Sequence, residues 1–384
     1  MSFGNPENPE TEASIDDITE LNLTDRNFKL PQVWRTNLAV DQQLPFGIVG
    51  TLEFIYSQDV TTPVVYNSIL RDPDGIFNGP DERPFWLAEN RVSPESAIYS
   101  NDEQFDNVFL LTNANRKADY YSVTTQFAKE FDNGFSTFVA YTHSRSRDLD
   151  AAGGSQAGSL WTNTVKEDRN NPELSYAAFD IPHRVIGNLA YSTKNTTISV
   201  FYQGSNAGRF SYTYSGNFGD QADRLMYIPN NASELNFQEY VVDGQTITVA
   251  EQMAALDAYI DQDDYLSENR GSIAERNGAL RPWLHRFDLR LTQDVQLTKD
   301  AKNKLQFSLD FLNFGNLLNS DWGVPKFANQ RNLLGYRGRN DQGEPIYRMN
   351  TISGTSELPT ETFRTTNSIG DTWRLQLGVR YTFN

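Results

Sequence analysis

Thirteen residues near the C-terminus, DTWRLQLGVRYTF over residues 371–383, constrain the fold more than any other stretch. Apolar and polar residues alternate strictly from Trp373 to Phe383, with an aromatic residue at each end of the apolar set. Successive side chains of a β-strand point to opposite faces, so this strand has one apolar and one polar face. About ten residues with an apolar lipid side, a polar lumen side and aromatic ends are typical of a transmembrane β-barrel strand. We therefore expect a membrane-spanning strand over residues 372–383.

The composition excludes several other classes of protein. Mean hydropathy is −0.58 over 384 residues, and no stretch approaches roughly 18 uncharged apolar residues, which excludes a helical membrane protein. The composition does not exclude a β-barrel, because only every second residue of its strands needs to be apolar. The net charge of −17 repels nucleic acid, so no nucleic-acid partner is expected. The chain has no cysteine, and its acidic first residues do not resemble a signal peptide.

Eight further segments carry the same alternation, and strong turn residues separate two pairs of them, Asp132-Asn133-Gly134 and Lys194-Asn195. The expected fold class is all-β, an antiparallel transmembrane β-barrel segment of about nine strands with long extracellular loops and one short loop helix. The expected strands cover residues 33–41, 48–57, 119–131, 134–145, 183–193, 196–205, 283–297, 304–313 and 372–383.

The connections between these strands alternate in length. Short turns are expected at residues 42–47, 132–133, 194–195 and 298–303. Long loops are expected at residues 58–118, 146–182, 206–282 and 314–371. Outer-membrane barrels show this asymmetry, with short periplasmic turns and long extracellular loops, whereas compact soluble domains rarely hold several structureless loops of this length. The pattern predicts the outer membrane of a Gram-negative bacterium, a periplasmic C-terminus and extracellular long loops.

Counting back from a periplasmic C-terminus places residues 1–32 outside the cell. Nine strands is an odd number, whereas bacterial single-chain barrels have an even number. We therefore expect that Met1 is not the natural start and that the chain is the C-terminal part of a longer barrel. Alone, its two edge strands would leave backbone groups unpaired in lipid.

One helix is expected in the third long loop, over residues 249–260, where Thr248 and Glu251 form a capping box. A helix that packs the loop against its neighbours is favoured over a ligand-contacting helix. The residues expected to share its packed face are Met253, Leu256, Tyr259 and Ile260.

Longer segments of the chain resemble the C-terminal barrel portion of TonB-dependent outer-membrane receptors. The Oar-like branch, whose full-length members carry a carboxypeptidase-regulatory-like domain, is the most similar. Together the matching segments span most of residues 105–384. They are NPELSYAAFDIPHRV (171–185), AALDAYIDQDDYLSENRGSIAERNGA (254–279), RFDLRLTQD (286–294), LDFLNFGNLLNSDWGV (309–324) and the terminal LGVRYTFN.

The resemblance implies a barrel of roughly 22 strands closed by an N-terminal plug. Such a receptor binds its substrate outside the cell and releases it when the periplasmic TonB energy-coupling complex pulls on the plug. We find no plug domain in this sequence, so the TonB complex would act through the missing N-terminal part. The substrate-binding residues stay unknown.

The terminal strand also resembles the C-terminal signal that the barrel-assembly machinery reads, carried here by Gly378, Tyr381 and Phe383. A regular strand in which one position is a glycine, without a side chain, can add to another sheet through main-chain hydrogen bonds. An ordinary closing strand is the alternative, and both interpretations can hold.

Six charged residues occupy polar positions of the last strands and are predicted to face the lumen. A salt-bridged ladder that hydrates the wall or contacts the plug is favoured over a substrate pathway. These residues are Arg286, Asp288, Arg290, Asp310, Arg374 and Arg380.

No metal or other cofactor is expected. His143, His183 and His285 fall on three different strands without a ligand spacing such as H-x-x-x-H. The acidic run over residues 261–264 has calcium-like spacing but lacks the glycine turn and closing glutamate of an EF-hand. A solvated loop is therefore favoured there over a calcium site.

Uptake of a bulky nutrient is the leading hypothesis for function. The alternative is a surface interaction or adhesion protein whose long loops bind a surface lipoprotein or polymer, with the barrel as anchor. An enzyme is disfavoured because no nucleophile elbow, P-loop or dinucleotide fingerprint is present.

Overall fold

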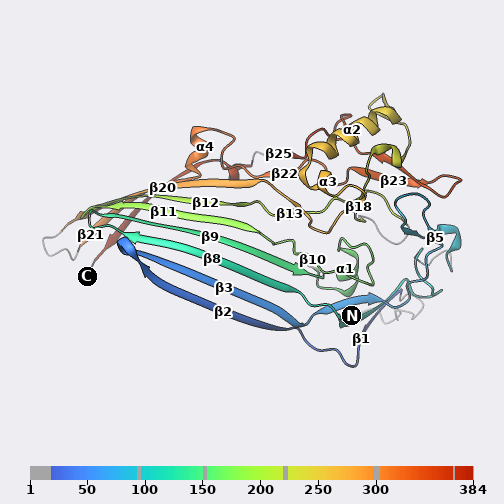
Figure 1. The fold of residues 1–384 in the computed structure, drawn as a ribbon, viewed down its shortest axis with the longest axis horizontal. Coiled ribbons are helices and arrows are strands. Elements are labelled where there is room, and N and C mark those ends of the chain that lie inside the picture. The colour runs from blue at the N-terminus through green and yellow to red at the C-terminus, as the bar shows by residue number, and fades with distance from the viewer. Residues whose placement is uncertain are drawn as a thin grey trace, which may run out of the picture.

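The computed structural model describes residues 19–92, 97–149, 154–218, 224–297, 303–365 and 368–383. Its largest element is a ten-stranded sheet, the wall, in which the short β10 (Ser175–Tyr176) pairs with the last residues of the interior strand β9 (Phe135–Asp148) (Figure 1). The other nine strands pair antiparallel, each with the next in chain order, which confirms the expected fold class. They are β2 (Gln32–Leu44), β3 (Ile48–Thr61), β8 (Asp119–Glu130), β9 (Phe135–Asp148), β11 (His183–Ser192), β12 (Thr196–Asn206), β20 (Trp283–Gln296), β21 (Lys304–Leu312) and β26 (Arg374–Thr382).

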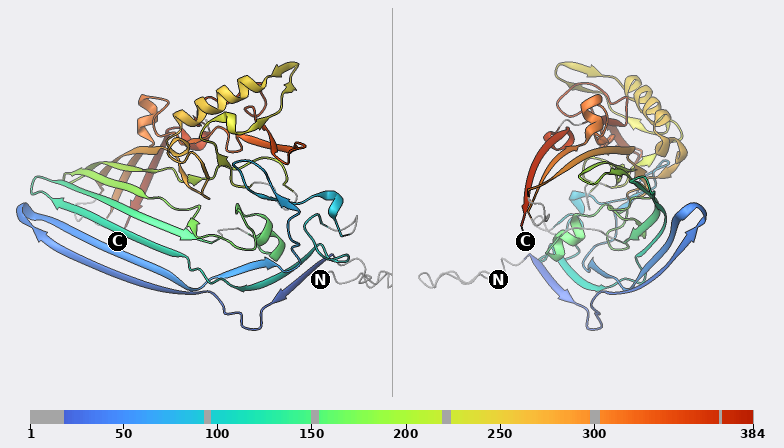
Figure 2. Two further views of the ribbon diagram at one scale, coloured as in Figure 1. Left: turned by 45° about the vertical axis from the view of Figure 1, so that its right-hand side comes forward. Right: turned by 90° about the vertical axis from the view of Figure 1, so that its left-hand side faces the viewer.

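Each of the nine strands overlaps one segment expected from the sequence, and some strands are longer. β2 continues to Leu44 and β9 continues to Asp148, because polar residues beyond the alternating stretch go on pairing with the neighbouring strand. Seen from the end with the short turns, the strands follow an arc, with β2 and β26 at its two edges (Figure 2).

The register of the wall aligns the apolar side chains of all nine strands on one face. Val200, for example, lies opposite Leu189 on one neighbouring strand and Leu289 on the other. Leu377 of β26 lies opposite Leu309, which in turn lies opposite Leu291. A slip of one residue at any pair would move a whole apolar set to the other face, so this alignment specifies the register.

Short turns gather at one end of the wall, the turn end (Figure 1). The β2–β3 turn is the 3-10 turn η2 (Pro45–Gly47), where Phe46 and Gly47 have φ of 65° and 73°. At the β8–β9 turn Gly134 has φ of 91°, and a Cβ there would run into the carbonyl oxygen of Ser192, so this position requires glycine. Residues 298–302 of the fourth expected turn lie outside the described residues.

The four long connections hold short strands and several helices, more regular structure than the one short loop helix expected from the sequence. Their described parts pack together at the opposite end of the wall, the loop end (Figure 1). We call the described residues within 62–118, 149–182, 207–282 and 313–373 the loop layer. Their strands are β1 (Glu20–Thr24, before the wall), β4 (Pro63–Asn67), β5 (Gly75–Ile76), β6 (Pro84–Phe85), β7 (Asn107–Asn113), β13 (Arg209–Phe210), β14 (Tyr227–Ile228), β15 (Asn236–Phe237), β16 (Tyr240–Val242), β17 (Gln245–Ile247), β18 (Ser272–Ile273), β19 (Ala279–Leu280), β22 (Lys326–Ala328), β23 (Leu334–Arg339), β24 (Pro345–Met349) and β25 (Phe363–Thr365). Their helices are α1 (Ala157–Thr162), α2 (Val249–Gln262), α3 (Asp264–Glu268) and α4 (Phe314–Leu318), with 3-10 turns η3 (Ala88–Asn90), η4 (Ala232–Glu234) and η5 (Ile369–Asp371).

The loop layer has its own hydrophobic core, drawn from three of the four connections. Phe77 comes from the first, Tyr212 and Tyr259 from the third, and Tyr347 from the fourth. Ordering each residue opposes folding by about 1–2 kcal/mol. Burial of apolar side chains in this shared core offsets that cost, which explains why segments of this length are ordered.

Helix α2 confirms the expected helix in position, cap and packed face. Thr248 and Glu251 form the capping box, Leu256, Tyr259 and Ile260 are buried, and Met253 packs against the same core. None of the helices in the described ranges combines the length and the apolar character needed to cross a membrane.

Candidate functional site

The apolar face of the wall is broad and exposed. Leu38, Leu52, Leu189 and Val379 are each more than half exposed, and Leu377 is 76% exposed. A soluble monomer rarely exposes an apolar patch beyond a few hundred Å², so a face of this kind indicates an apolar environment.

The height of this face matches a membrane. On β8 the apolar set lies between Asp119 and Lys129, which bound it on the same face. Ten residues at about 3.3 Å each span roughly 33 Å along the strand, or about 25 Å across a membrane at a strand tilt of about 40°. Outer-membrane barrels carry an apolar band of about 25 Å.

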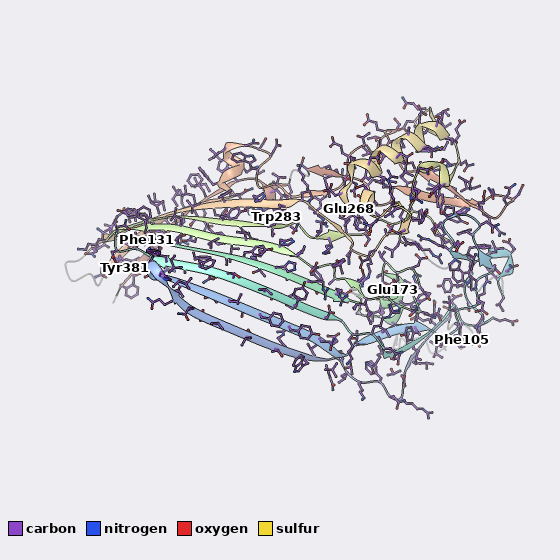
Figure 3. The ribbon with its side chains drawn as sticks, viewed as in Figure 1. Phe105, Phe131, Glu173, Glu268, Trp283 and Tyr381 are labelled. Carbon is purple, nitrogen blue, oxygen red and sulfur yellow. The ribbon has the colours of Figure 1, made fainter. Side chains whose placement is uncertain are left out.

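Aromatic residues border the apolar face at both ends. Phe131 and Tyr381 lie at the turn end, whereas Trp283 lies toward the loop end (Figure 3). At the turn end Phe135 also packs near Tyr191, with ring centroids 4.7 Å apart. Aromatic side chains with a polar tip suit the two membrane–water interfaces, so these two rows resemble the girdles of a barrel.

The three histidines belong to the loop-end row of aromatics. His143 and His183 lie directly opposite each other, with ring centroids 5.0 Å apart. Tyr141 Oη lies 2.7 Å from His183 Nδ1, and Tyr202 Oη lies 2.8 Å from His285 Nδ1. Each of these two imidazoles thus completes the hydrogen bonding of a tyrosine. Within the described residues, no group of three His, Cys, Asp or Glu side chains is arranged to hold a metal ion.

The opposite face of the wall is polar, and hydrogen bonds between side chains cross it from strand to strand. Asn37 donates to Glu53 at 3.1 Å, and Lys304 forms an ion pair with Asp294 at 2.9 Å. The register places all six residues predicted to face the lumen on this side: Arg286, Asp288, Arg290, Asp310, Arg374 and Arg380.

Two of these six residues pair with each other, and two others find partners outside the set. Arg290 Nε lies 3.3 Å from Asp310 Oδ1, in an ion pair between β20 and β21. Arg286 reaches Asp371 of η5 at 3.3 Å, and Asp288 accepts a hydrogen bond at 2.7 Å from the backbone N–H of Asn313.

Two more of the six, Arg374 and Arg380, lie opposite Leu312 and Gln306 on β21. They form no ion pair in the described part of the chain. The ladder therefore joins the wall to the segments after β21 and before β26, and it leaves two cations on the polar face.

Two residues of the expected assembly signal, Gly378 and Tyr381, lie on edge strand β26, and the third, Phe383, follows its last residue. A Cβ on Gly378 would clash with the hydroxyl of Ser308 on the neighbouring strand β21, and glycine avoids this clash. Tyr381 Oη donates to Asn303 Oδ1 at 2.8 Å, and Phe383 stacks on the Tyr381 ring at 5.6 Å. In the described residues β26 pairs only with β21, so its other edge has no partner strand.

A buried polar cluster ties all four connections together. Asp81, 2% exposed, accepts hydrogen bonds from the hydroxyls of Tyr214 and Tyr347, both at 2.9 Å, and pairs with buried Arg83. Arg83 Nη1 also reaches Glu167 at 3.1 Å. Burial raises the pKa of both tyrosines well above the usual value. Burial opposes the charge of Arg83, but Asp81 and its neighbours raise the pKa of the guanidinium overall.

The acidic run in the third connection is only partly solvated, which corrects the expectation for its middle residue. Asp263 is buried, accepts hydrogen bonds from Tyr212 Oη at 2.6 Å and Thr362 Oγ1 at 2.7 Å, and caps α3 through the N–H of Leu266. Asp261 stays exposed and pairs with Arg270 at 2.6 Å. With its carboxylate used in this way, Asp263 is a structural residue.

The loop layer also contains cavities beside these clusters. One, of about 490 Å³, lies between α3 and β25 and is lined by Phe210, Asp264, Tyr265, Glu268 and Phe363 among others. A second, of about 370 Å³, is lined by Arg71, Trp86 and Trp161. Aromatic walls with a few charged groups suit binding of a polar ligand. The sequence offered no signal for these groups, because their residues come from separate connections.

One comparison with known proteins, that with a family model, agrees with this geometry. The family model of the outer membrane beta barrel domain matches residues 3–334, so the chain belongs to this family, whose location is the outer membrane. A comparison with curated proteins finds no match. Among solved structures, the outer membrane transporter YddB from Escherichia coli is similar at 10% identity with a TM-score of 0.45, over 95% of this chain and 34% of that one. The chain thus spans about a third of the length of YddB, and this likeness is too low to bear on function.

Proposed function

We propose that this chain forms one section of the wall of a TonB-dependent outer-membrane transporter that takes up a bulky nutrient. The observation that carries the proposal is the two-faced wall. Its apolar face has the height of a membrane, and its polar face carries a charged ladder that suits a water-filled or plugged lumen.

The same geometry supports an orientation and a set of partners. The turn end lies in the periplasm, and the loop layer lies outside the cell, where it meets the substrate. Further strands pair with the free edges of β2 and β26, because open sheet edges do not occur in lipid. The barrel-assembly machinery inserts the barrel through β26. The TonB complex supplies energy through a plug that contacts the polar face.

Deletion of the gene in its host tests the proposal. Cells are grown on nutrients too large for general porins, such as iron chelates, oligosaccharides and oligopeptides, each as the sole source. The expected result is lost growth on at least one of them, restored by the intact gene and not by a gene without β26. Uptake should also stop when a protonophore dissipates the proton gradient. Unchanged growth and uptake across the whole panel would overturn the proposal.

A second function is favoured by the separate core of the loop layer. A rigid surface held by α2 and the buried Asp81 cluster would present a binding site for a surface lipoprotein or a polymer, with the wall as anchor. Pull-down from solubilised outer membranes distinguishes the two functions. Loss of a partner on removal of residues 224–281, with nutrient uptake unchanged, would favour the interaction protein.

A further inference from the structure

Helix α4 and the turn after it, residues 314–322, form what we call the α4 segment. The segment lies apart from the hydrophobic core of the loop layer and packs against the apolar face of the wall. A Cβ placed on Gly315 would lie 3.7 Å from the side chain of Trp322 and 3.9 Å from that of Phe287 on β20. Phe287 belongs to the apolar face, because it is two residues from Leu289 on the same strand and therefore points to the same side.

These contacts fix the height of the α4 segment relative to the membrane. Phe287 lies four residues beyond Trp283 toward the turn end of β20, and Trp283 belongs to the loop-end row of aromatics. Four residues span about 13 Å along a strand, or about 10 Å of height at a tilt of about 40°. Phe314 also meets Phe311 of β21, with ring centroids 5.9 Å apart, and Phe311 pairs with Leu289 still nearer the turn end.

The pictures agree with this height. In the shared view of Figures 1 and 3, α4 lies beside β20 and nearer the turn end than Trp283. The α4 segment therefore reaches past the loop-end row of aromatics, to a height at which the wall presents its apolar face.

The side chains of the α4 segment are arranged in the opposite way to those of a water-exposed loop. Asn316 is buried: its amide donates to two backbone carbonyls of the segment, at 2.8 and 3.1 Å, and its oxygen accepts from the N–H of Trp373 at 3.1 Å. Leu318 and Trp322, in contrast, are 65% and 54% exposed. A segment in lipid requires this arrangement, because a polar group without a hydrogen-bond partner is costly there.

The α4 segment also has a polar part. Residues 319–321 are polar and exposed, whereas Leu317, Leu318 and Trp322 on either side of them are apolar and exposed. A short amphipathic segment of this kind suits the boundary between acyl chains and headgroups, where tryptophan with its polar N–H is also favoured.

We propose that the α4 segment is seated in the outer leaflet of the membrane as an interfacial anchor. Leu317, Leu318 and Trp322 contact acyl chains, and residues 319–321 meet the headgroups. The apolar surface is continuous from Phe287 to the segment, so one occupant, the lipid bilayer, covers both. The inference rests on the proposed membrane position of the wall, and the proposed orientation assigns the outer leaflet.

Site-directed spin labelling tests the anchor. The full-length gene product with a single cysteine is labelled with a nitroxide in phosphatidylcholine vesicles, and electron paramagnetic resonance measures its relaxation by oxygen, which concentrates in lipid, and by a water-soluble nickel complex. We expect oxygen to dominate at Leu318→Cys, as it should at Leu377→Cys on the wall. Val241→Cys is the matched control, because Val241 is also apolar and 65% exposed but lies on β16 of the loop layer. The nickel complex should dominate there.

Each other outcome contradicts a different part of the reasoning. Dominance of the nickel complex at position 318, with oxygen dominant at position 377, would place the α4 segment in water and overturn the proposal. Exclusion of both reagents from position 318 would show that protein covers the segment, which would also overturn it. If position 377 behaved like position 241, the membrane position of the wall would fail, and the anchor would fail with it.

Discussion

Replacement of Asp81 by asparagine is the sharpest test of how the loop layer is held together. Asp81 and Arg83 are 2% and 1% exposed, and Asp81 also accepts hydrogen bonds from the hydroxyls of Tyr214 and Tyr347. Asparagine keeps the shape and one acceptor oxygen but removes the charge that compensates Arg83.

The expected loss follows from the burial of this pair. Removing one partner of a buried ion pair costs about 3–5 kcal/mol, because the other charge is left uncompensated. Glu167 still reaches Arg83 at 3.1 Å, so the lower end of the range applies. A change of about 3 kcal/mol corresponds to a rise of more than roughly a hundredfold in the population of the opened loop layer.

Hydrogen exchange followed by mass spectrometry measures this opening directly. Peptides from residues 224–237 and 344–350 should exchange more than about a hundredfold faster in Asp81→Asn, whereas peptides from the wall should not change. Asp341→Asn is the matched control, because Asp341 is exposed and its replacement removes the same charge. Loop-layer exchange within about threefold of the unmodified protein would refute the role assigned to the cluster.

Three further predictions concern other parts of the molecule. A hydrogen bond from Arg71, the largest contribution, lowers the pKa of Asp74 to about 2, so its stabilisation is complete above about pH 4 and is lost as the pH falls toward 2. Tryptophan fluorescence should therefore show a loop transition in this window that is weaker in Asp74→Asn. Arg290→Ala should change unfolding free energy by less than about 1 kcal/mol, because its ion pair is exposed. Leu377→Arg should destabilise the barrel by about 2–4 kcal/mol in bilayers, and Gln376→Arg should have little effect.

Each of these three predictions can fail in a distinct way. An identical acid transition in Asp74→Asn would show that the carboxylate contributes nothing there. A loss of several kcal/mol in Arg290→Ala would mean that the ladder is buried in the assembled barrel. Equal unfolding free energies for the two arginine variants on β26, measured in lipid vesicles, would show that the apolar face does not meet lipid.

The wall was predictable from the sequence because lipid on one face requires strict alternation. In β26 this pattern persists for the whole strand, and in β20 it is interrupted at Leu284 and Gln293. Neither strand needs information about distant residues. The ends were less predictable. β9 extends to Asp148 because polar residues near the loop end continue the ladder, and polar residues carry no alternation signal.

The loop layer was predictable only where its signal is local. The capping box at Thr248 lies within one turn of α2, and the helix was expected for that reason. In contrast, Asp81 meets tyrosines far along the chain, and Asp263 is buried by Tyr212 and Thr362 from two other segments. The sequence around these acids does not differ from that of a solvated loop, so their burial follows only from tertiary packing.

Single-cysteine labelling tests most directly whether the wall meets lipid on one face and water on the other, because the chain contains no cysteine of its own. Cysteine is placed at Leu377 on the apolar face or at Gln376 on the polar face, and a charged, membrane-impermeant maleimide is applied to the barrel in native outer membranes made permeable to it on both sides. We predict that Gln376→Cys is labelled and that Leu377→Cys reacts only with a lipid-soluble maleimide. Rapid labelling of Leu377→Cys by the charged reagent would contradict the membrane position of the wall.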